Sequence, residues 1–340
     1  MTAPRVLVTG AAGFIGSAVA ASLAARGWAV VGCDNFNDYY SPALKADRVS
    51  ALLAPVGVAC HLVELADSVE VAALFRDAMP THVIHLAAQA GVRHSLDHPE
   101  AYVRANLLGF ANMLEACRRW QPRHFVYASS SSVYGASAKV PFQEDERTDA
   151  PLSFYAATKK ANEVMAHSYS QLFGVPTTGL RLFTVYGPWG RPDMACFQFA
   201  GKMRGGEAIP VYAGGNLSRD FTYIDDVADA VVRLLPLAPG AHRIVNIGSA
   251  RPVPLFDFID ALARALHVRP RLALLPMQAG DMAATWADTG RLRQLVGHVP
   301  STPLATGLAD FAAWFDAHGQ GYGQAPPLPA AASPAPRPAP

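Results

Sequence analysis

The sequence contains little charge and no long apolar run. Only 16% of its 340 residues are charged, and Lys plus Arg (28) nearly balance Asp plus Glu (27). A formal net charge of +1 gives no electrostatic basis for binding nucleic acid. With 51% hydrophobic residues the chain is too apolar to be disordered, and it is long enough for one large or two modest domains.

Cysteine is also scarce. The four cysteines form no CxxC pair, which argues against a metal site and against a disulfide framework. They are typical of buried thiols in a reducing compartment. The first apolar run is broken at Gly10, where a signal peptide needs a continuous apolar segment, and nowhere do 18 uncharged apolar residues follow one another. We therefore expect a cytoplasmic protein without a membrane segment or a metal.

Short β-branched runs alternate with longer amphipathic stretches through the first half of the chain. Six runs are expected to be buried strands: 5–9, 29–33, 58–63, 82–86, 124–128 and 177–183. One stretch between them, residues 101–120, spaces Leu107, Phe110, Ala111, Leu114 and Cys117 by three or four positions, as on one face of a helix. Repeated strand–helix–strand units predict a doubly wound parallel sheet of the Rossmann type.

The rhythm changes after Gly187 to shorter segments punctuated by Gly and Pro. We expect an NAD-binding domain over residues 1–186 and a smaller α/β lobe, mainly for the substrate, over 187–320. Residues 321–340 are dominated by Pro and Ala and predict a disordered tail, which is either a docking peptide or a solvated segment with no specific role.

A glycine-rich turn follows the first predicted strand. TGAAGFIG places Gly10, Gly13 and Gly16 where backbone N–H groups and the positive end of a helix can hold a pyrophosphate. The second strand leads into Asp34, whose carboxylate can accept hydrogen bonds from an adenosine ribose and repel a 2′-phosphate. These residues predict NAD rather than NADP. The alternative for Asp34 is a turn or cap residue.

A tyrosine and a lysine stand four positions apart in the helical segment FYAATKKANEVMAHSY. A lysine ammonium next to a phenol, with a cationic nicotinamide nearby, is expected to pull the pKa of Tyr155 below its ordinary value of about 10. Tyr155 would then act as a general base. The alternative is that Tyr155 and Lys159 form an ordinary solvated helix surface.

Four serines, Ser129 to Ser132, follow the predicted strand HFVYA. They come at the carboxyl end of a parallel strand, where α/β sheets bind ligands, so a serine hydroxyl can bridge a substrate oxygen to Tyr155. A flexible linker is the alternative for this serine run.

Together these motifs resemble the extended short-chain dehydrogenase/reductase family (NAD-dependent epimerases and dehydratases), and within it the UDP-glucuronate 4-epimerases. The resemblance runs from about Arg5 to Phe315 and rests on TGAAGFIG, DNFNDYY, HLAAQAGVRHS, YASSSSVYG, YAATKKANE, FTVYGPWGRPDM and RDFTYIDD. It implies a Rossmann-type NAD domain, a nucleotide-sugar lobe and a homodimer.

The resemblance also assigns site residues. It places Ser130, Tyr155 and Lys159 at the catalytic positions. Around the NAD it places Gly10, Gly13, Phe14, Ile15, Gly16, Asp34, Asn35, Leu65, Ala87, Ala88, Asn106, Tyr155, Lys159 and Val185. Around the nucleotide sugar it places Ser130, Ser131, Thr184, Arg191, Tyr212 and Arg219.

Two positions depart from the family pattern. Glu64 stands where relatives commonly carry an aspartate for the adenine. Gln278 stands where UDP-galactose 4-epimerases typically carry an arginine for the diphosphate, which weakens that variant of the reaction.

The expected reaction is inversion of C4 of a UDP-hexuronic acid, from UDP-glucuronate to UDP-galacturonate, through a 4-keto intermediate. Dehydratases and decarboxylases that resemble this chain carry acidic residues after the catalytic serine, where this chain has Ser131 and Ser132. The alternatives are a UDP-glucose/UDP-galactose 4-epimerase or another nucleotide-sugar epimerase or decarboxylase. A non-catalytic NAD sensor is an alternative of a different class, but it has no use for an intact serine, tyrosine and lysine.

Overall fold

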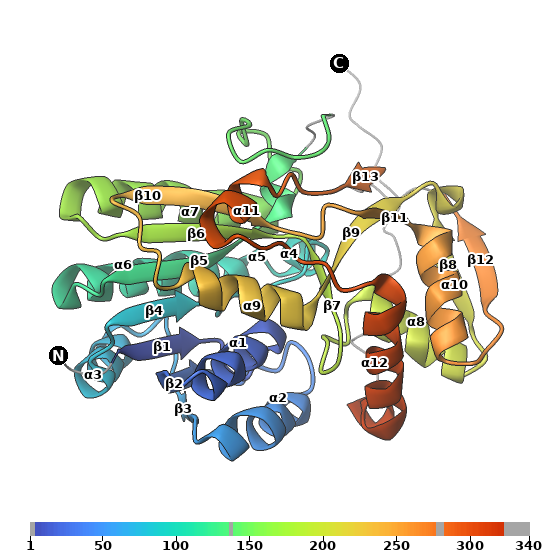
Figure 1. The fold of residues 1–340 in the computed structure, drawn as a ribbon, viewed down its shortest axis with the longest axis horizontal. Coiled ribbons are helices and arrows are strands. Elements are labelled where there is room, and N and C mark those ends of the chain that lie inside the picture. Colours follow the sequence, from blue (N-terminus) through green and yellow to red (C-terminus); the bar gives the residue numbers. More distant parts are fainter. Residues whose placement is uncertain (1–3, 136–138, 277–281, 323–340) are drawn as a thin grey trace.

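The computed structural model describes residues 4–135, 139–276 and 282–322. A parallel seven-stranded sheet in the order β10-β6-β5-β4-β1-β2-β3 is its main layer (Figure 1). Its strands are β1 (Arg5–Thr9), β2 (Ala29–Asp34), β3 (Ala59–Leu62), β4 (His82–His85), β5 (His124–Ser130), β6 (Thr177–Leu182) and β10 (His242–Ile247). The order reverses between β1 and β4, so the sheet is doubly wound as predicted.

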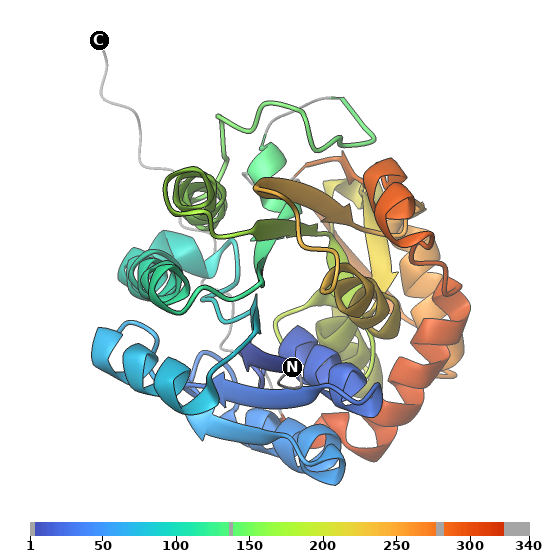
Figure 2. The ribbon, with the colours of Figure 1, turned by 60° about the vertical axis from the view of Figure 1, so that its left-hand side comes forward.

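Helices cover both faces of this sheet (Figure 2). One apolar core joins alternate strand residues such as Val8 and Val126 to α1 (Phe14–Ala25) and α9 (Ile224–Leu234). The other core joins strand residues such as Leu7 and Phe125 to α3 (Ser68–Ala78), α6 (Gly109–Trp120) and α7 (Phe154–Phe173). Because side chains alternate along each strand, the central strands β1, β2, β4 and β5 contribute to both cores.

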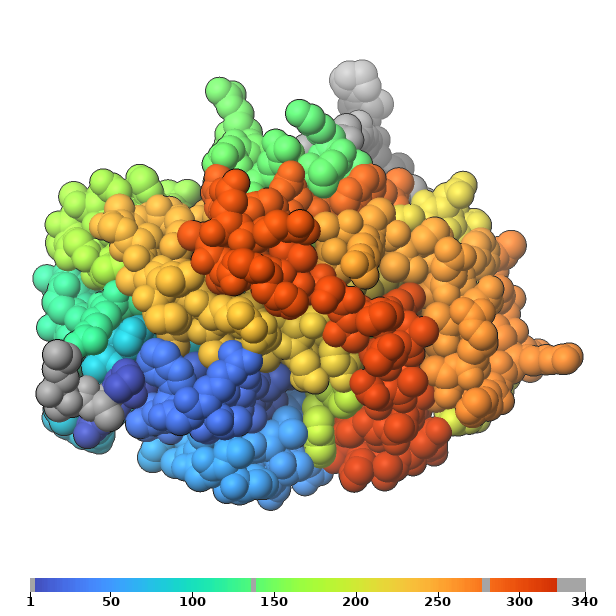
Figure 3. Space-filling model, viewed as in Figure 1, coloured from blue at the N-terminus to red at the C-terminus, as the bar shows by residue number. Residues whose placement is uncertain are grey.

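The second lobe contains two small sheets. In one, β9 (Ser218–Tyr223) pairs with β7 (Thr184–Tyr186), β11 (Pro252–Pro254) and β13 (Ala284–Thr285). In the other, β8 (Ala208–Tyr212) pairs with β12 (Arg271–Leu275). The lobe's helices are α8 (Ala195–Arg204), α10 (Leu255–Ala265) and α12 (Leu304–Ala317). Figure 3 shows the segment from α11 (Gly290–Val296) to α12 running over the front of the molecule between the helical layer of the sheet and this lobe.

The lobes do not divide cleanly at the predicted boundary of residue 187. β7 already pairs with β9 of the second lobe, whereas α9 and β10 return to the large sheet from within the segment 187–320. At the other end, a 3-10 turn covers Gly319–Tyr322, across the predicted start of the tail. The predicted tail from residue 323 onward lies outside the described residues, as does Gln278.

The helical region between β4 and β5 differs from the prediction. A single helix was expected over 101–120, but α5 (Pro99–Tyr102) and α6 are joined by a π-helical turn, Val103–Leu108. A short helix, α4 (His94–Asp97), precedes them, and α2 (Pro42–Arg48) follows β2. Across the described residues, no helix is both long enough and apolar enough to span a bilayer.

Candidate functional site

The turn between β1 and α1 accepts only glycine at two positions. Gly10 has φ +70°, and a Cβ there would lie 2.7 Å from the backbone nitrogen of Ala87. A Cβ on Gly16 would lie 1.9 Å from the carbonyl oxygen of Gly10. Helix α1 follows Gly13 without a side-chain cap on its first N–H groups, and its first residues are the buried Phe14 and the half-buried Ile15. The turn therefore has the form of an anion cradle at a helix N-terminus.

Asp34 ends β2, the strand next to this turn. It is buried (9% exposed), and its Oδ1 accepts the N–H of Phe36 at 2.8 Å. The carboxylate thus caps its own turn, as the turn alternative predicts, and it does so at the carboxyl end of the sheet, where the cofactor contact is predicted. Behind it, the buried Lys45 donates to the carbonyl and the side chain of Asn37 at 2.7 and 2.8 Å, which fixes the following loop.

Asn35 and Glu64 meet across the ends of β2 and β3. Asn35 Nδ2 lies 3.4 Å from Glu64 Oε2, while Glu64 Oε1 accepts the N–H of Ala66 at 2.9 Å. Leu65, which lies between Glu64 and Ala66 in the sequence, is buried. The longer acid is therefore held at the edge of the cradle beside Asn35, where the family pattern has an adenine contact.

Asn106 lies on the π-helical turn before α6 and is buried. Its Oδ1 accepts the N–H of Gln89, and its Nδ2 donates to the carbonyl of Gln89 and to Thr158 Oγ1 at 3.0 Å each. Ala87 and the half-buried Ala88 precede Gln89 after β4, and the N–H of Ala87 donates to Thr9 Oγ1 at 3.3 Å. Asn106 thus ties the loop after β4 to the catalytic helix.

The predicted catalytic residues come together at the start of α7. The helix begins at Phe154, after Ser153 caps the N–H of Ala156, and one turn separates Tyr155 from Lys159. Lys159 Nζ donates to the carbonyl of Ala128 on β5 at 3.0 Å. Ser130, the last residue of β5, lies close enough to Tyr155 for its hydroxyl to favour the ionised phenol. The serine run is therefore the end of a buried strand and a 3-10 turn (Ser131–Tyr134), not a flexible linker.

Burial dominates the proton affinities of the two helix residues. It raises the pKa of Tyr155, and the hydroxyl of Ser130 and the positive charge of Arg191 oppose that rise. It lowers the pKa of Lys159 to about 8. The lowering expected for Tyr155 is thus not a property of the protein alone, because loss of solvent around the phenol outweighs the neighbouring groups.

Arg191 lies close enough to Tyr155 to act on it, and it is itself held in place. Its Nε donates to Asp193 Oδ1 at 2.9 Å, and one terminal nitrogen donates to Oδ2 of the same carboxylate. Tyr39, from the segment after Asp34, donates to Asp193 Oδ2 at 3.1 Å. Phe14, Val185 and Arg191 are among the residues that line one very small cavity of about 10 Å³.

The remaining predicted substrate residues come from the second lobe. Thr184 and Val185 begin β7, paired with Phe221 and Thr222 of β9. Tyr212 ends β8, with the guanidinium of Arg93 lying 5.6 Å from its ring centroid. Arg219 lies in β9 and donates to the carbonyl of Ser218 at 2.9 Å.

Three residues at this site were missed by sequence reasoning. Ser95 Oγ accepts the N–H of Tyr155 at 3.2 Å. Glu163 forms a buried ion pair with Arg181, with Nε–Oε1 at 2.8 Å. Glu163 follows Lys159 by one more helical turn, so the four-residue spacing that found the first pair also points to it. Nothing local signals Arg181, which lies on a strand.

The chain is similar to known proteins along most of its length. The sequence profile of the NAD dependent epimerase/dehydratase family matches residues 6–248. The UDP-glucuronate 4-epimerase 3 of Arabidopsis thaliana is 46% identical over 327 residues, covering 91% of this chain and 76% of that protein. A probable UDP-glucuronate 4-epimerase of Rhizobium meliloti (strain 1021) is 44% identical over 331 residues, covering 92% and 97%. The crystal structure of the UDP-glucuronic acid 4-epimerase of Bacillus cereus with UDP-glucuronic acid and NAD superposes with a TM-score of 0.85 at 32% identity, covering 92% of this chain and 99% of that one.

Proposed function

The chain belongs to the NAD dependent epimerase/dehydratase family, and we propose that it interconverts UDP-glucuronate and UDP-galacturonate by inverting C4. It is an isomerase that uses NAD. The observation that carries the proposal is the placing of Ser130 and Arg191 near Tyr155, with Lys159 one helical turn on, in a chain similar to UDP-glucuronate 4-epimerases over 91–92% of its length.

The residues present fit NAD. Gly10, Gly13 and Gly16 leave the backbone open for a pyrophosphate, and the N-terminus of α1 favours its charge. Asp34 would hold the adenosine ribose and repel a 2′-phosphate. The other proposed contacts are Phe14, Ile15, Asn35, Leu65, Ala87, Ala88, Asn106 and Val185, with Glu64 beside Asn35 reaching the adenine. Held by these residues, NAD would supply the hydride acceptor and donor for oxidation and re-reduction at C4 of the sugar.

Side chains of this protein transfer the proton of the 4-hydroxyl. Tyr155 takes the proton of the 4-hydroxyl and gives it back, and Ser130 bridges the phenol to the same oxygen. Lys159 carries a positive charge below its pKa of about 8 and stabilises the phenolate. Because Ser131 and Ser132 supply no acid or base at neutral pH, the site favours return of the hydride over loss of water or of CO2.

The carboxylate of the substrate has to be restrained, because a 4-keto uronate is a β-keto acid and loses CO2 when its carboxylate bond lines up with the carbonyl π system. We assign this restraint to Ser131, Thr184 and Arg191, which offer two hydroxyls and a guanidinium at the mouth of the site. Asp193 fixes the plane of the Arg191 guanidinium. Tyr212 and Arg219 are assigned to the nucleotide.

We further propose that the chain forms a homodimer in the cytoplasm. Its four free cysteines suit a reducing compartment. Exposed apolar side chains support self-association through the α6–α7 face: Val164 (57% exposed) and Leu172 (71%) lie on α7, and Val103 and Leu108 precede α6. Sedimentation of the purified protein measures its oligomeric state.

The test is to incubate purified protein separately with UDP-glucuronate, UDP-glucose and UDP-xylose and to identify the products by chromatography. We expect UDP-galacturonate from UDP-glucuronate and little turnover of the other two. Equal turnover of UDP-glucose would contradict the carboxylate restraint and favour a general hexose epimerase. If the protein binds NAD but turns over none of the three sugars, a non-catalytic NAD sensor would be favoured.

A further inference from the structure

The serine turn, Ser131–Tyr134, is held at its far end by a buried tyrosine. Tyr134 is 2% exposed, and its hydroxyl donates to Asn246 Oδ1 at 2.7 Å. Its ring stacks on Phe142, with centroids 4.4 Å apart and planes 10° from parallel. The guanidinium of Arg181 lies 4.7 Å from the centre of the same ring.

The residue before the catalytic serine is held by the same arginine, through a carboxylate. Ser129 Oγ donates to Glu163 Oε1 at 2.7 Å, and Glu163 accepts from Arg181 Nε and Nη2 at 2.8 and 2.9 Å. The Arg181 and Glu163 side chains are 3% and 5% exposed. Arg181 therefore contacts the ring of Tyr134 at one end of the segment 129–134. At the other end it contacts the Glu163 carboxylate, which accepts from Ser129.

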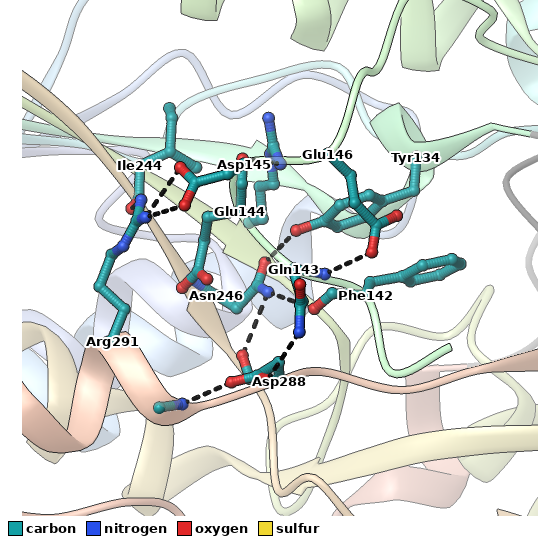
Figure 4. Close-up of polar contacts among 12 residues, drawn as sticks. Tyr134, Phe142, Gln143, Glu144, Asp145, Glu146, Ile244, Asn246, Asp288 and Arg291 are labelled. Carbon is teal, nitrogen blue, oxygen red and sulfur yellow. Dashed lines mark hydrogen bonds and ion pairs between the residues drawn. The ribbon is translucent and has the colours of Figure 1, made fainter. Parts of the chain in front are cut away.

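Asn246, at the end of β10, connects this turn to two other segments (Figure 4). Its Nδ2 donates to the carbonyls of Phe142 at 2.9 Å and Asp288 at 3.2 Å, and its backbone N–H donates to Glu144 Oε1 at 2.9 Å. The two carbonyl acceptors fix the orientation of the amide, so that Oδ1 points to Tyr134. The residue is fully buried.

The segment 284–288, here called the strap, continues from Asn246 to the proposed nucleotide strand. Phe142 donates its N–H to the carbonyl of Trp286 and accepts the N–H of Asp288, both at 2.9 Å. Thr285, in the same strap, pairs with Arg219 of β9. An unbroken series of hydrogen bonds and strand pairings thus runs from Arg219 to the serine turn.

We propose that Tyr134 and Asn246 are positioning residues that fix the serine turn against the strap, and so set where Ser131 meets the carboxylate of the substrate. The proposal rests on the proposed function. Nucleotide contacts in the second lobe then help to orient the sugar end of the same substrate, which is how binding energy remote from the reacting atoms contributes to selectivity.

The consequence of loosening this link is chemical. A 4-keto uronate whose carboxylate is free to rotate undergoes cleavage of its C5–C6 bond. The electron pair passes into the C4 carbonyl as an enolate, CO2 leaves, and C5 is protonated by water. This gives a UDP-linked 4-keto pentose and leaves the hydride from C4 on the cofactor as NADH. The fraction of turnovers that end this way reports on the position of the serine turn rather than on overall stability.

The test uses Tyr134→Phe, which removes one hydroxyl and keeps the stacked ring. We expect the yield of decarboxylated product per UDP-galacturonate to rise about three- to tenfold, as suits the loss of one buried hydrogen bond. We expect the preference for binding UDP-glucuronate over UDP-xylose, measured by calorimetry, to fall by a similar factor. Phe142→Leu removes the stacked ring but leaves the backbone hydrogen bonds to the strap. It should also raise the yield of decarboxylated product and lower the binding preference, and it is the second test if Tyr134→Phe folds poorly.

Tyr169→Phe is the matched control. It removes a hydrogen bond of similar length, Tyr169 Oη to Glu115 Oε1 at 2.6 Å, from the outer part of α7. It should leave the product ratio and the binding preference as in the wild type. If the variants at Tyr134 and Phe142 are only slower, with both ratios unchanged, the positioning role is wrong while the proposed function stands. If the wild type does not form UDP-galacturonate, both are overturned.

Discussion

At the scale of single residues, the proposed base is a phenol that the protein alone does not ionise. Burial raises the pKa of Tyr155. Ser130, Arg191 and the protonated Lys159 must therefore act on it together, with substrate and cofactor bound, before it serves as a base.

Replacing Tyr155 by Phe keeps the ring and removes the proton acceptor. We expect epimerisation to fall at least about 100-fold, as is typical of a lost acid–base group, with NAD still bound. Turnover of UDP-glucuronate and the NAD content of the purified variant measure the two effects. Near-normal turnover would show that Tyr155 is not the base.

Asp34 is predicted to set the choice between NAD and NADP. Asp34→Ala should weaken NAD and relax its preference over NADP by on the order of tenfold or more, because ribose hydrogen bonds and phosphate repulsion are lost together. Asp34→Asn separates the two roles of this residue, since an amide oxygen can still accept the N–H of Phe36 while carrying no charge. Dissociation constants for both cofactors are the measurement. An unchanged ratio of the NAD and NADP dissociation constants in both variants would show that Asp34 only caps its turn.

Sequence reasoning found the residues whose chemistry has a local signature. The spacing of Tyr155 and Lys159 and the glycines after β1 are visible in a few residues of sequence. Arg181 and Asn246 are not, because their partners lie far away in sequence, such as Tyr134 at 112 positions from Asn246. Only the folded chain shows that their polar atoms are buried and paired.

At the scale of elements, the predicted strands agree with the structure because short, continuously buried β-branched runs mark them clearly. The helix expected over 101–120 was only partly right. A regular helix satisfies the apolar spacing of Phe110, Leu114 and Cys117, but Asn106 has to turn inward to bond Gln89 and Thr158, and a π-helical turn provides the extra residue. Apolar periodicity carries no information about such a polar requirement.

The turn before α1 provides a test at this scale. In Gly16→Ala the new methyl group would collide with the carbonyl of Gly10, so the turn must shift and NAD should bind at least about tenfold more weakly, consistent with an overpacking cost of about 1–3 kcal/mol. Gly201→Ala is the control, because Gly201 is exposed within α8 with open space around it. That change should leave NAD binding intact and stabilise the protein by about 0.5–1 kcal/mol. Equal NAD affinity in both variants would contradict the cradle.

At the scale of the whole molecule, two lobes share one chain that crosses between them more than once. The prediction of a Rossmann-type sheet with a smaller lobe is confirmed, but β10 (His242–Ile247) was not foreseen as its seventh strand. Its return to β6 depends on pairing across 65 residues, from His242 to Thr177. Local patterns cannot show which distant strand a short apolar run will join.

Buried imidazoles should make the folded protein sensitive to acid. Burial lowers the pKa of His85 to about 3 and that of His124 to about 4, whereas an unfolded imidazole titrates near its ordinary value of 6.5. Below about pH 6.5 the unfolded chain binds protons that the folded one excludes, so stability falls by about 1.4 kcal/mol per pH unit for each of these residues.

Urea unfolding at about pH 7 and about pH 5 measures this loss. His124→Gln should reduce the difference between the two free energies of unfolding, because Gln does not titrate. His61→Gln, at an exposed position, should not change the difference. The same pH dependence in all three proteins would assign the acid sensitivity to other groups.

The most direct test of the central claim follows the hydrogen at C4. UDP-glucuronate carrying deuterium at C4 is incubated with the purified protein in ordinary water, and the UDP-galacturonate formed is examined by NMR and mass spectrometry. Inversion through a 4-keto intermediate predicts that the deuterium remains at C4 of the product, since the hydride removed is the hydride returned. Loss of the label to solvent would mean inversion through a carbanion formed by proton abstraction, and would contradict the account.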